Sequence, residues 1–317
     1  MKQMLARYPI GNPRRKWRQD NFVISLINPG PMGLEHAGEV AREKARRGVE
    51  TAKDAGFNLA EFCWSSREVG LEMVRTAERV GLDVAYQDLL RFGGMGYRGR
   101  QNLSPEENDL DGILRDSAAW KCIKGLEIYD EPITEEQRKL ARSMVDRAEE
   151  MRPGLFPSVI SDAGYIDAVA DEVDPVNVSF DLYPFGNWGG CCPPAEGQLD
   201  TFRFWEYLEI GRLAAKRIGA PYWFVYQGHA LPYHPSFDVF TFAAARVMAN
   251  AALLYGAKGL ACYIECDGVL DPTTGGHGVY FEEQKELNRE LAALGNTLMA
   301  LECRRVIHDK SVREGTN

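Results

Sequence analysis

The chain has 317 residues, of which 45% are hydrophobic and 26% charged, a composition typical of a protein with a large core. Its formal net charge is −9 and its acidic residues are spread along the chain, so we expect neither a nucleic-acid partner nor binding to an anionic membrane, both of which need a basic face. No apolar run approaches the ~20 residues of a membrane span, and the seven cysteines lack the CxxC spacing of a zinc site, so we expect no metal and no other cofactor.

The two ends of the chain differ in composition from the rest. Residues 1–20 include a basic cluster, which we interpret as part of a solvated N-terminal arm rather than as a binding patch. The cluster consists of Arg14, Arg15, Lys16 and Arg18. The opening MKQMLARYPIGNPRRKW lacks the apolar centre of a signal peptide, so we expect a cytoplasmic protein, or a secreted or periplasmic one if a signal peptide has been removed. Residues 305–317 are polar and form a predicted tail.

Between these ends, eight short apolar segments have the pattern of buried strands. They are residues 22–30, 58–64, 83–90, 125–132, 155–162, 176–185, 222–228 and 259–268. Each is followed by a longer segment whose apolar residues have helical spacing. The predicted helices are residues 35–55, 65–80, 105–120, 134–151, 165–173, 200–218, 237–255 and 281–303. Helix 134–151 has the clearest ends, because Thr134 is a favourable N-cap and Arg152-Pro153-Gly154 cannot continue a helix.

This alternation predicts a parallel sheet covered by helices. Eight βα units match the number that closes a (β/α)8, or TIM, barrel, which we place at residues 21–304. The alternative is an open, doubly wound sheet. Its first strand is normally followed by GxGxxG, whereas this chain has NPGPMG at that point.

In such a barrel the active site forms at the carboxyl ends of the strands. Here those ends carry carboxylates, amides and aromatic rings but no lysine, which argues against an aldolase that forms a Schiff base. Polar groups beside flat rings suit a carbohydrate. We expect the following side chains to bind it: Glu61, Trp64, Gln87, Asp88, Asp130, Tyr183, Trp188, Gln227, His229 and Tyr263.

Some of these residues have a second interpretation. The polar residues at 61–88 could instead form a polar layer at the top of the barrel, and Trp188 could be buried between two subunits. Three further aromatic residues, Tyr86, Tyr129 and Tyr226, also fall at the predicted strand ends. The oligomeric state is left open by the sequence.

The stretch GLEIYDEPI (125–133) ends a predicted strand on two adjacent carboxylates, Asp130 and Glu131. Side chains alternate along a strand, so we expect only one of the two to point into the barrel mouth. Pro132 then stops strand pairing. We interpret the stretch as presenting one carboxylate to the pocket. The alternative is that both acids cap the next helix, although Thr134 already serves as its cap.

This strand end, an acidic residue followed by Glu and Pro, resembles the Asn-Glu-Pro motif of clan A glycoside hydrolases, with Glu131 at the position of the motif's glutamate. The segments VSFDLYPF and LLYGAKGLACYIE are similar to barrel domains of bacterial glycosidases related to the family 42 β-galactosidases. The resemblance covers most of the barrel. It implies hydrolysis of O-glycosidic bonds, with Glu131 as the general acid/base. In several such enzymes a β-sandwich follows the barrel.

One position departs from that pattern. Clan A enzymes carry a nucleophilic glutamate at the end of strand seven, where the predicted strand of this chain has Gln227. Either the strand count is off by one and Glu265 is the nucleophile, or the second carboxylate comes from elsewhere, with Asp181 as the next candidate. As counted, Glu265 lies across the barrel from Glu131. A wide gap between the carboxyls, about 6.5–9.5 Å, would favour an inverting mechanism.

We therefore predict a glycosidase of carbohydrate metabolism, a hydrolase that degrades an oligo- or polysaccharide with Glu131 as proton donor. The first alternative is a catalytically inactive, carbohydrate-binding barrel, which Gln227 favours. The second is a metal-dependent isomerase or lyase. His229, His234 and Glu265 could supply its ligands, but a loop is a poor guarantee that the two histidines meet.

Overall fold

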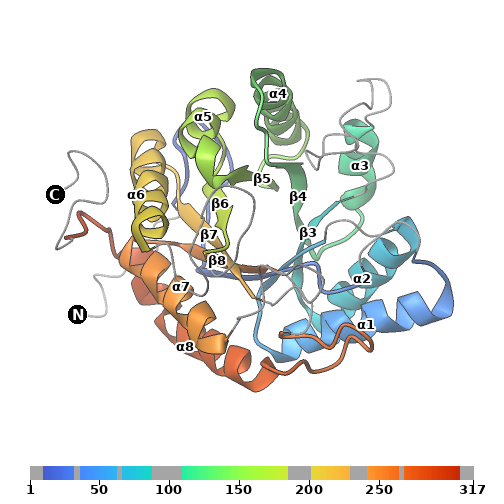
Figure 1. The fold of residues 1–317 in the computed structure, drawn as a ribbon. Coiled ribbons are helices and arrows are strands. Elements are labelled where there is room, and N and C mark those ends of the chain that lie inside the picture. The colour runs from blue at the N-terminus through green and yellow to red at the C-terminus, as the bar shows by residue number, and fades with distance from the viewer. Residues whose placement is uncertain are drawn as a thin grey trace.

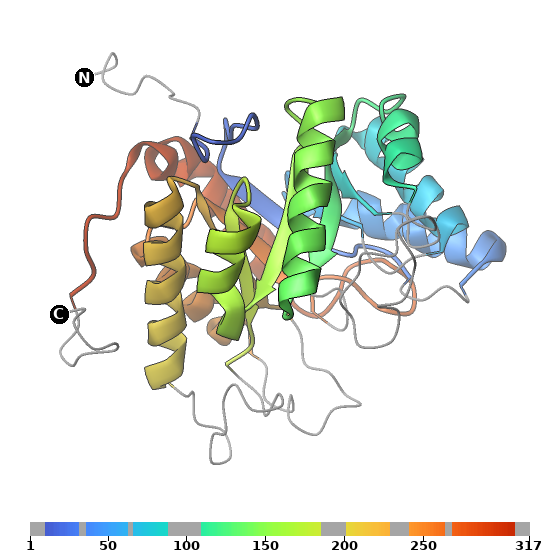
Figure 2. The same ribbon diagram turned by 90° about the horizontal axis from the view of Figure 1, so that it is seen from above.

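The computed structural model describes residues 10–31, 36–62, 66–87, 109–184, 201–228, 241–263 and 268–307. Within these ranges, eight parallel strands close into a barrel in chain order, each hydrogen-bonded to its neighbours in sequence and β1 also to β8. The helices form a ring around the strands, also in chain order (Figure 1, Figure 2). The predicted (β/α)8 fold is confirmed.

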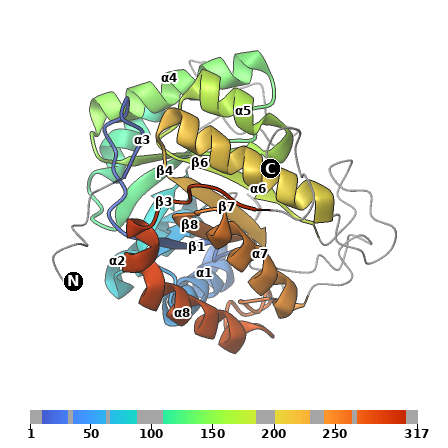
Figure 3. The same ribbon diagram turned by 90° about the vertical axis from the view of Figure 1, so that its left-hand side faces the viewer.

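The strands are β1 (Val23–Ile27), β2 (Leu59–Glu61), β3 (Asp83–Tyr86), β4 (Ile123–Asp130), β5 (Phe156–Asp162), β6 (Val178–Leu182), β7 (Tyr222–Gln227) and β8 (Gly259–Tyr263). The helices are α1 (Gly38–Asp54), α2 (Arg67–Val80), α3 (Leu110–Ser117), α4 (Glu135–Met151), α5 (Ile166–Ala168), α6 (Thr201–Ile218), α7 (Phe242–Leu254) and α8 (Phe281–Ala300). Figure 3 shows α6, α7 and α8 side by side along one flank of the barrel. None of the helices in the described ranges is long and apolar enough to cross a membrane.

Local sequence sets the helix ends. The Thr134 hydroxyl accepts a hydrogen bond from the Gln137 backbone N–H, and the Gln137 side chain accepts one from the Thr134 backbone N–H, which completes a capping box at α4. Ser66 caps α2, and Gly81 ends that helix in the left-handed conformation. The cap at Thr134 stands where the sequence predicted it.

The fifth helical segment is less regular than predicted. Residues 165–173 were expected to form one helix, but α5 has only three residues and is followed by a π-helical turn over Val169–Val173. The segment stops at Asp174, which adopts a left-handed conformation with φ 53°. Asp174 precedes Pro175, and a residue before proline is disfavoured in the right-handed helical region.

Strand register places inward-facing side chains in layers of four, each drawn from alternate strands. The lower layer is Ser25, Ala85, Ser158 and Trp223. The middle layer is Glu61, Glu127, Ser179 and Ala261. The upper layer is Ile27, Gln87, Ile160 and Val225. All twelve residues are buried. The interior is therefore packed, but its middle layer is unusually polar for a barrel core.

The floor of the barrel is closed by the N-terminal arm. Trp17 packs on Phe156 and Trp223, with ring centroids 4.9 Å and 6.2 Å away. The Trp223 indole N–H donates to the Gln19 side-chain oxygen at 2.8 Å. Gly259 permits this packing, because a Cβ atom there would lie 2.7 Å from the Trp223 ring. The arm thus supplies part of the barrel core.

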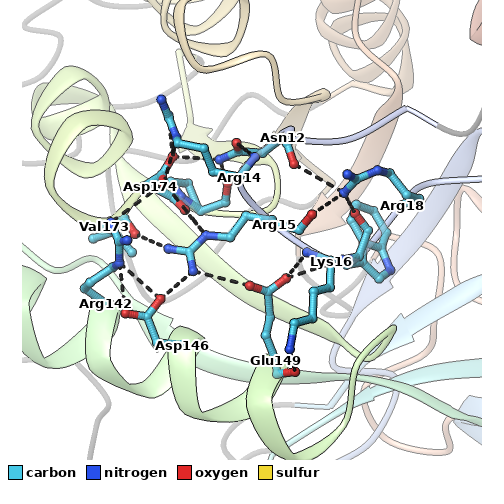
Figure 4. Close-up of polar contacts among 12 residues, drawn as sticks. Asn12, Arg14, Arg15, Lys16, Arg18, Arg142, Asp146, Glu149, Val173 and Asp174 are labelled. Carbon is cyan, nitrogen blue, oxygen red and sulfur yellow. Dashed lines mark hydrogen bonds and ion pairs between the residues drawn. The ribbon is translucent and has the colours of Figure 1, made fainter.

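One residue of the basic cluster, Arg15, is not solvated as expected, whereas Arg14 and Lys16 are exposed. Arg15 is 5% exposed, and its guanidinium donates to Asp146 (2.5 Å), Glu149 (3.3 Å) and the backbone oxygens of Asp174 and Val173 (Figure 4). The prediction was wrong here because a run of basic residues in sequence does not show which acids the fold will place beside it. Asp146 and Glu149 lie on α4, so these contacts fasten the arm to the barrel wall.

Candidate functional site

The described residues hold eight of the thirteen side chains predicted to form the site. Five lie outside the described ranges: Trp64, Asp88, Trp188, His229 and Glu265. Of the two histidines considered as metal ligands, His234 also lies outside. Among the described residues, no group of three His, Cys, Asp or Glu side chains could hold a metal ion.

The described site residues at the barrel mouth lie at the carboxyl ends of β4, β6, β7 and β8. Asp130 ends β4, Gln227 ends β7 and Tyr263 ends β8. Asp181 lies on β6, and Tyr183 follows that strand. By contrast, Tyr86, Tyr129 and Tyr226 pack in the hydrophobic core cluster that fills the space between strands and helices, so they do not reach the mouth.

A β-bulge decides which acid of the Asp-Glu pair points inward. Glu127 pairs with Ser158 and Tyr129 with Val159, so the register shifts at Ile128. Ile128 and Tyr129 consequently both face the helices, and Asp130 takes the inward position beside Ile160. Simple alternation along the strand would have turned Asp130 outward.

Glu131 lies one residue beyond the strand in a left-handed conformation, φ 51°, and its backbone N–H donates to Ile160 O at 2.9 Å. Such a conformation costs a non-glycine residue of order 1 kcal/mol and often occurs at functional sites. The residue is half-buried. Because Thr134 and Gln137 form the cap of α4, that helix needs neither Asp130 nor Glu131 for capping.

The acids at the mouth perturb one another. Burial raises the pKa of Asp130 well above its ordinary value, and the negative charges of Glu131, Glu127 and Glu61 raise it further. Burial likewise raises the pKa of Asp181, with added repulsion from Glu131 and then Asp130. The Tyr183 hydroxyl donates a hydrogen bond that partly offsets this effect. Ionisation of one of Asp130, Glu131 and Asp181 therefore opposes ionisation of the others.

Two tyrosine rings lie beside these acids. Tyr183 and Tyr263 are stacked, with ring centroids 5.1 Å apart and planes inclined by 21°. Both are half-buried. Burial, with the charge of Asp181, raises the pKa of Tyr183 well above its ordinary value, so its hydroxyl stays a hydrogen-bond donor. The pair combines flat apolar surface with polar ends, which suits contact with a sugar ring.

The seventh strand of the barrel is the one predicted from the sequence. β7 ends on Gln227, which is fully buried and pairs with Tyr263 on β8. Glu265 follows β8, so the idea that the count was off by one is wrong. An amide, not a carboxylate, stands at the end of strand seven.

Two of the predicted polar residues lie below the mouth rather than in it. Glu61 is 2% exposed in the middle layer of the barrel, where its carboxylate accepts a hydrogen bond from the Ser25 hydroxyl at 2.7 Å. Gln87, 7% exposed, lies in the layer above. Glu61 thus belongs to a polar layer, as the alternative interpretation of residues 61–88 had it, but at the middle of the barrel rather than at its top.

Glu127, a second buried carboxyl in the layer of Glu61, was not among the residues predicted from the sequence. Burial raises the pKa of Glu127 to about 8, and the charge of Glu61 adds to the effect. Burial raises the pKa of Glu61 to about 7, although hydrogen bonds from Ser25 and Ser158 act to lower it. The signal was present in GLEIYDEP, where a charged residue interrupts an otherwise apolar strand.

No protein-family model matches the chain, and no curated protein matches its sequence. Among solved structures, a putative α-L-fucosidase from Bacteroides thetaiotaomicron is 12% identical with a TM-score of 0.60 over 90% of this chain and 98% of that one. A GH2 β-galacturonidase from Eisenbergiella tayi is 14% identical, with a TM-score of 0.59 over 90% of this chain and 55% of that one. A β-galactosidase from the psychrophilic Marinomonas ef1 is 12% identical, with a TM-score of 0.64 over 88% of this chain and 62% of that one.

These structural neighbours are glycoside hydrolases of several kinds, and they do not single out family 42. This chain spans between half and two thirds of the length of the β-galacturonidase and the β-galactosidase. At identities of 12–14%, the likeness shows a shared barrel fold.

Proposed function

We propose that this protein is a glycoside hydrolase that cleaves an oligo- or polysaccharide by carboxylic acid/base catalysis, with Glu131 as the proton donor. The observation that carries the proposal is the cluster of Asp130, Glu131 and Asp181 at the carboxyl ends of β4 and β6. Hydrolysis of a glycoside needs one carboxyl that keeps its proton and one that has lost it. Mutual repulsion within a partly buried cluster produces that division at neutral pH.

In this mechanism Glu131 protonates the glycosidic oxygen as the bond to the sugar breaks. The second carboxyl either attacks the anomeric carbon or takes a proton from the attacking water. Among the described residues, Asp181 is the candidate, because the charge of Glu131 acts directly on it. Glu265 remains the other candidate for this role. The stacked Tyr183 and Tyr263 support the sugar ring.

Leaving-group dependence tests the donor. Glu131→Gln should lower hydrolysis of ordinary oligosaccharides by about 10²–10⁴-fold, the usual contribution of a general acid. Hydrolysis of an aryl glycoside with an acidic phenol as leaving group should fall much less, because that group departs without protonation. Equal losses on both substrates would count against Glu131.

Two further variants complete the test. If Asp130→Asn, and not Glu131→Gln, shows the leaving-group dependence, the donor is Asp130. Asp181→Asn should be impaired on both substrates, and restored activity with azide would identify Asp181 as a nucleophile. NMR of the first product formed then distinguishes retention from inversion.

A second candidate function is a barrel that binds carbohydrate without cleaving it. The buried amide of Gln227 at the end of β7 favours it, since clan A enzymes carry their nucleophilic glutamate there. Calorimetric binding of a glycan that the protein leaves intact over days would support this reading. Turnover of that glycan would exclude it.

A further inference from the structure

The barrel interior contains two carboxyls that the proposed hydrolysis does not use, Glu61 on β2 and Glu127 on β4. Register places them in the same layer, and each residue is 2% exposed. The other two members of that layer, Ser179 and Ala261, are small. The two carboxyl groups therefore occupy the centre of the barrel at this level.

These two glutamates have different surroundings. The Ser25 hydroxyl donates to Oε1 of Glu61 at 2.7 Å, and the Ser158 hydroxyl also stabilises the charge of Glu61. Oε2 of Glu127, in contrast, has no hydrogen-bond partner among the described residues. An ionised carboxylate is costly to bury without donors, whereas a protonated one is much less so. The geometry thus assigns the charge to Glu61 and the proton to Glu127.

The groups that face this pair come from every strand of the barrel. Ser25 and Ser158 lie below it, and Ile27, Gln87, Ile160 and Val225 lie above it. Among the described residues, the ionisable groups beyond that upper layer are acids or phenols: Asp130, Glu131, Asp162, Asp181, Tyr183 and Tyr263. No inward position of the described strands is a lysine or arginine, so none of these positions neutralises the pair.

We propose that the Glu61–Glu127 pair is a positioning element of the candidate site: Glu127 keeps its proton to higher pH than Glu61, the first negative charge of the pair forms on Glu61, and that charge joins burial and the nearby Glu131 in holding Asp130 in its acid form. With Asp130 neutral, the mouth retains Glu131 and Asp181 as titrating acids, the two that glycoside hydrolysis uses. This catalytic consequence rests on the proposed function, whereas the three protonation states do not.

Carboxyl titration of the unaltered protein tests the first part. The chain is labelled with ¹³C at the Asp and Glu side-chain carboxyls and titrated by NMR, with signals assigned from Glu127→Gln, Glu61→Gln and Asp130→Asn. The glutamate signal with the highest titration midpoint, well above the ordinary pKa of about 4.3, should disappear in Glu127→Gln. If every glutamate has lost its proton by about pH 6, the proposal fails.

Replacement of the charged member tests the coupling. In Glu61→Gln the titration midpoint of Asp130 should fall by about one pH unit, a tenfold loss of proton affinity, because a like charge has been removed. Glu150→Gln makes the same chemical change at an exposed position near the far end of α4 and should leave the midpoint unmoved. An unchanged Asp130 midpoint in folded Glu61→Gln overturns the proposal.

Ser25→Ala tests the coupling between Glu61 and Asp130 if Glu61→Gln does not fold. It removes only a hydroxyl donor to Glu61, so Glu61 should keep its proton to higher pH and the Asp130 midpoint should fall in the same direction. Once a substrate is known, the alkaline limb of kcat/KM should move to lower pH with the Asp130 midpoint. A purely structural role would lower the rate equally at all pH values. Absence of hydrolysis would remove the proposed function and leave the titration result standing.

Discussion

Replacement of Arg15 by alanine should strongly destabilise this barrel. The Arg15 guanidinium is nearly inaccessible and joins the arm to Asp146 and Glu149 on α4 and to two backbone oxygens. Its loss leaves Glu149, whose side chain is 7% exposed, without its cation. Removing one partner of a buried ion pair costs about 3–5 kcal/mol. At ~2.1 cal/mol/K of unfolding entropy per residue, this corresponds to a fall in Tm of roughly 5–8 °C for this chain.

Arg14→Ala is the matched control. Arg14 is the adjacent residue and pairs with Asp174 at 2.5 Å, but its side chain is 56% exposed. Asp174 also keeps the Asn12 amide as a donor. We expect a loss of at most about 1 kcal/mol, as for exposed ion pairs in general. Urea unfolding followed by tryptophan fluorescence measures both variants. Equal effects of the two substitutions, or a loss below about 1 kcal/mol for Arg15→Ala, would refute the reasoning from burial.

Three other predictions follow from the barrel core. The folded pKa of Glu127, about 8, lies above its ordinary value of 4.5, so the native state binds a proton that the unfolded chain has lost, and stability should fall as pH rises between these values by on the order of 5 kcal/mol. Glu127→Gln should flatten this slope in urea titrations at several pH values, whereas an unchanged slope would contradict the assignment. Trp17→Ala should cost about 2–4 kcal/mol through loss of floor packing, measured by thermal unfolding against Lys16→Ala. Gly259→Ala should cost about 1–3 kcal/mol because its Cβ would clash with the Trp223 ring, and a Tm equal to that of the parent would show that the ring moves aside.

The periodicity of apolar residues was sufficient to predict the fold. Seven of the eight predicted strands contain the observed one, whereas β4 begins at Ile123, two residues before its predicted segment. The cap at Thr134 stands where the sequence indicated. These features are local, since a strand or a cap depends on residues within a few positions of one another. The buried state of Arg15 is not local. Its partners on α4 are more than a hundred residues away in the sequence, and no pattern around residue 15 predicts them.

Only one of the two buried glutamates in the barrel interior was singled out from the sequence. Glu61 was identified as a residue of interest but was assigned to the sugar pocket, while Glu127 was read as part of a strand. Their common layer follows from how far successive strands are staggered around the barrel, which a single sequence does not show. The small residues Ser179 and Ala261 make room for the two carboxyls only once that stagger is set.

The bulge at Ile128 connects these features to the chemistry of the mouth. Without it, Glu127, Tyr129 and Glu131 would share the inward face, and Asp130 would face the helices. With it, Asp130 stands directly above Glu127 along the inner face of β4, and Glu131 is displaced past the strand end into a left-handed turn. The one extra residue therefore places two acids of the same strand at the mouth instead of one. Adjacent, partly buried carboxyls raise one another's pKa. The pKa values at this site therefore depend on backbone geometry as well as on residue identity.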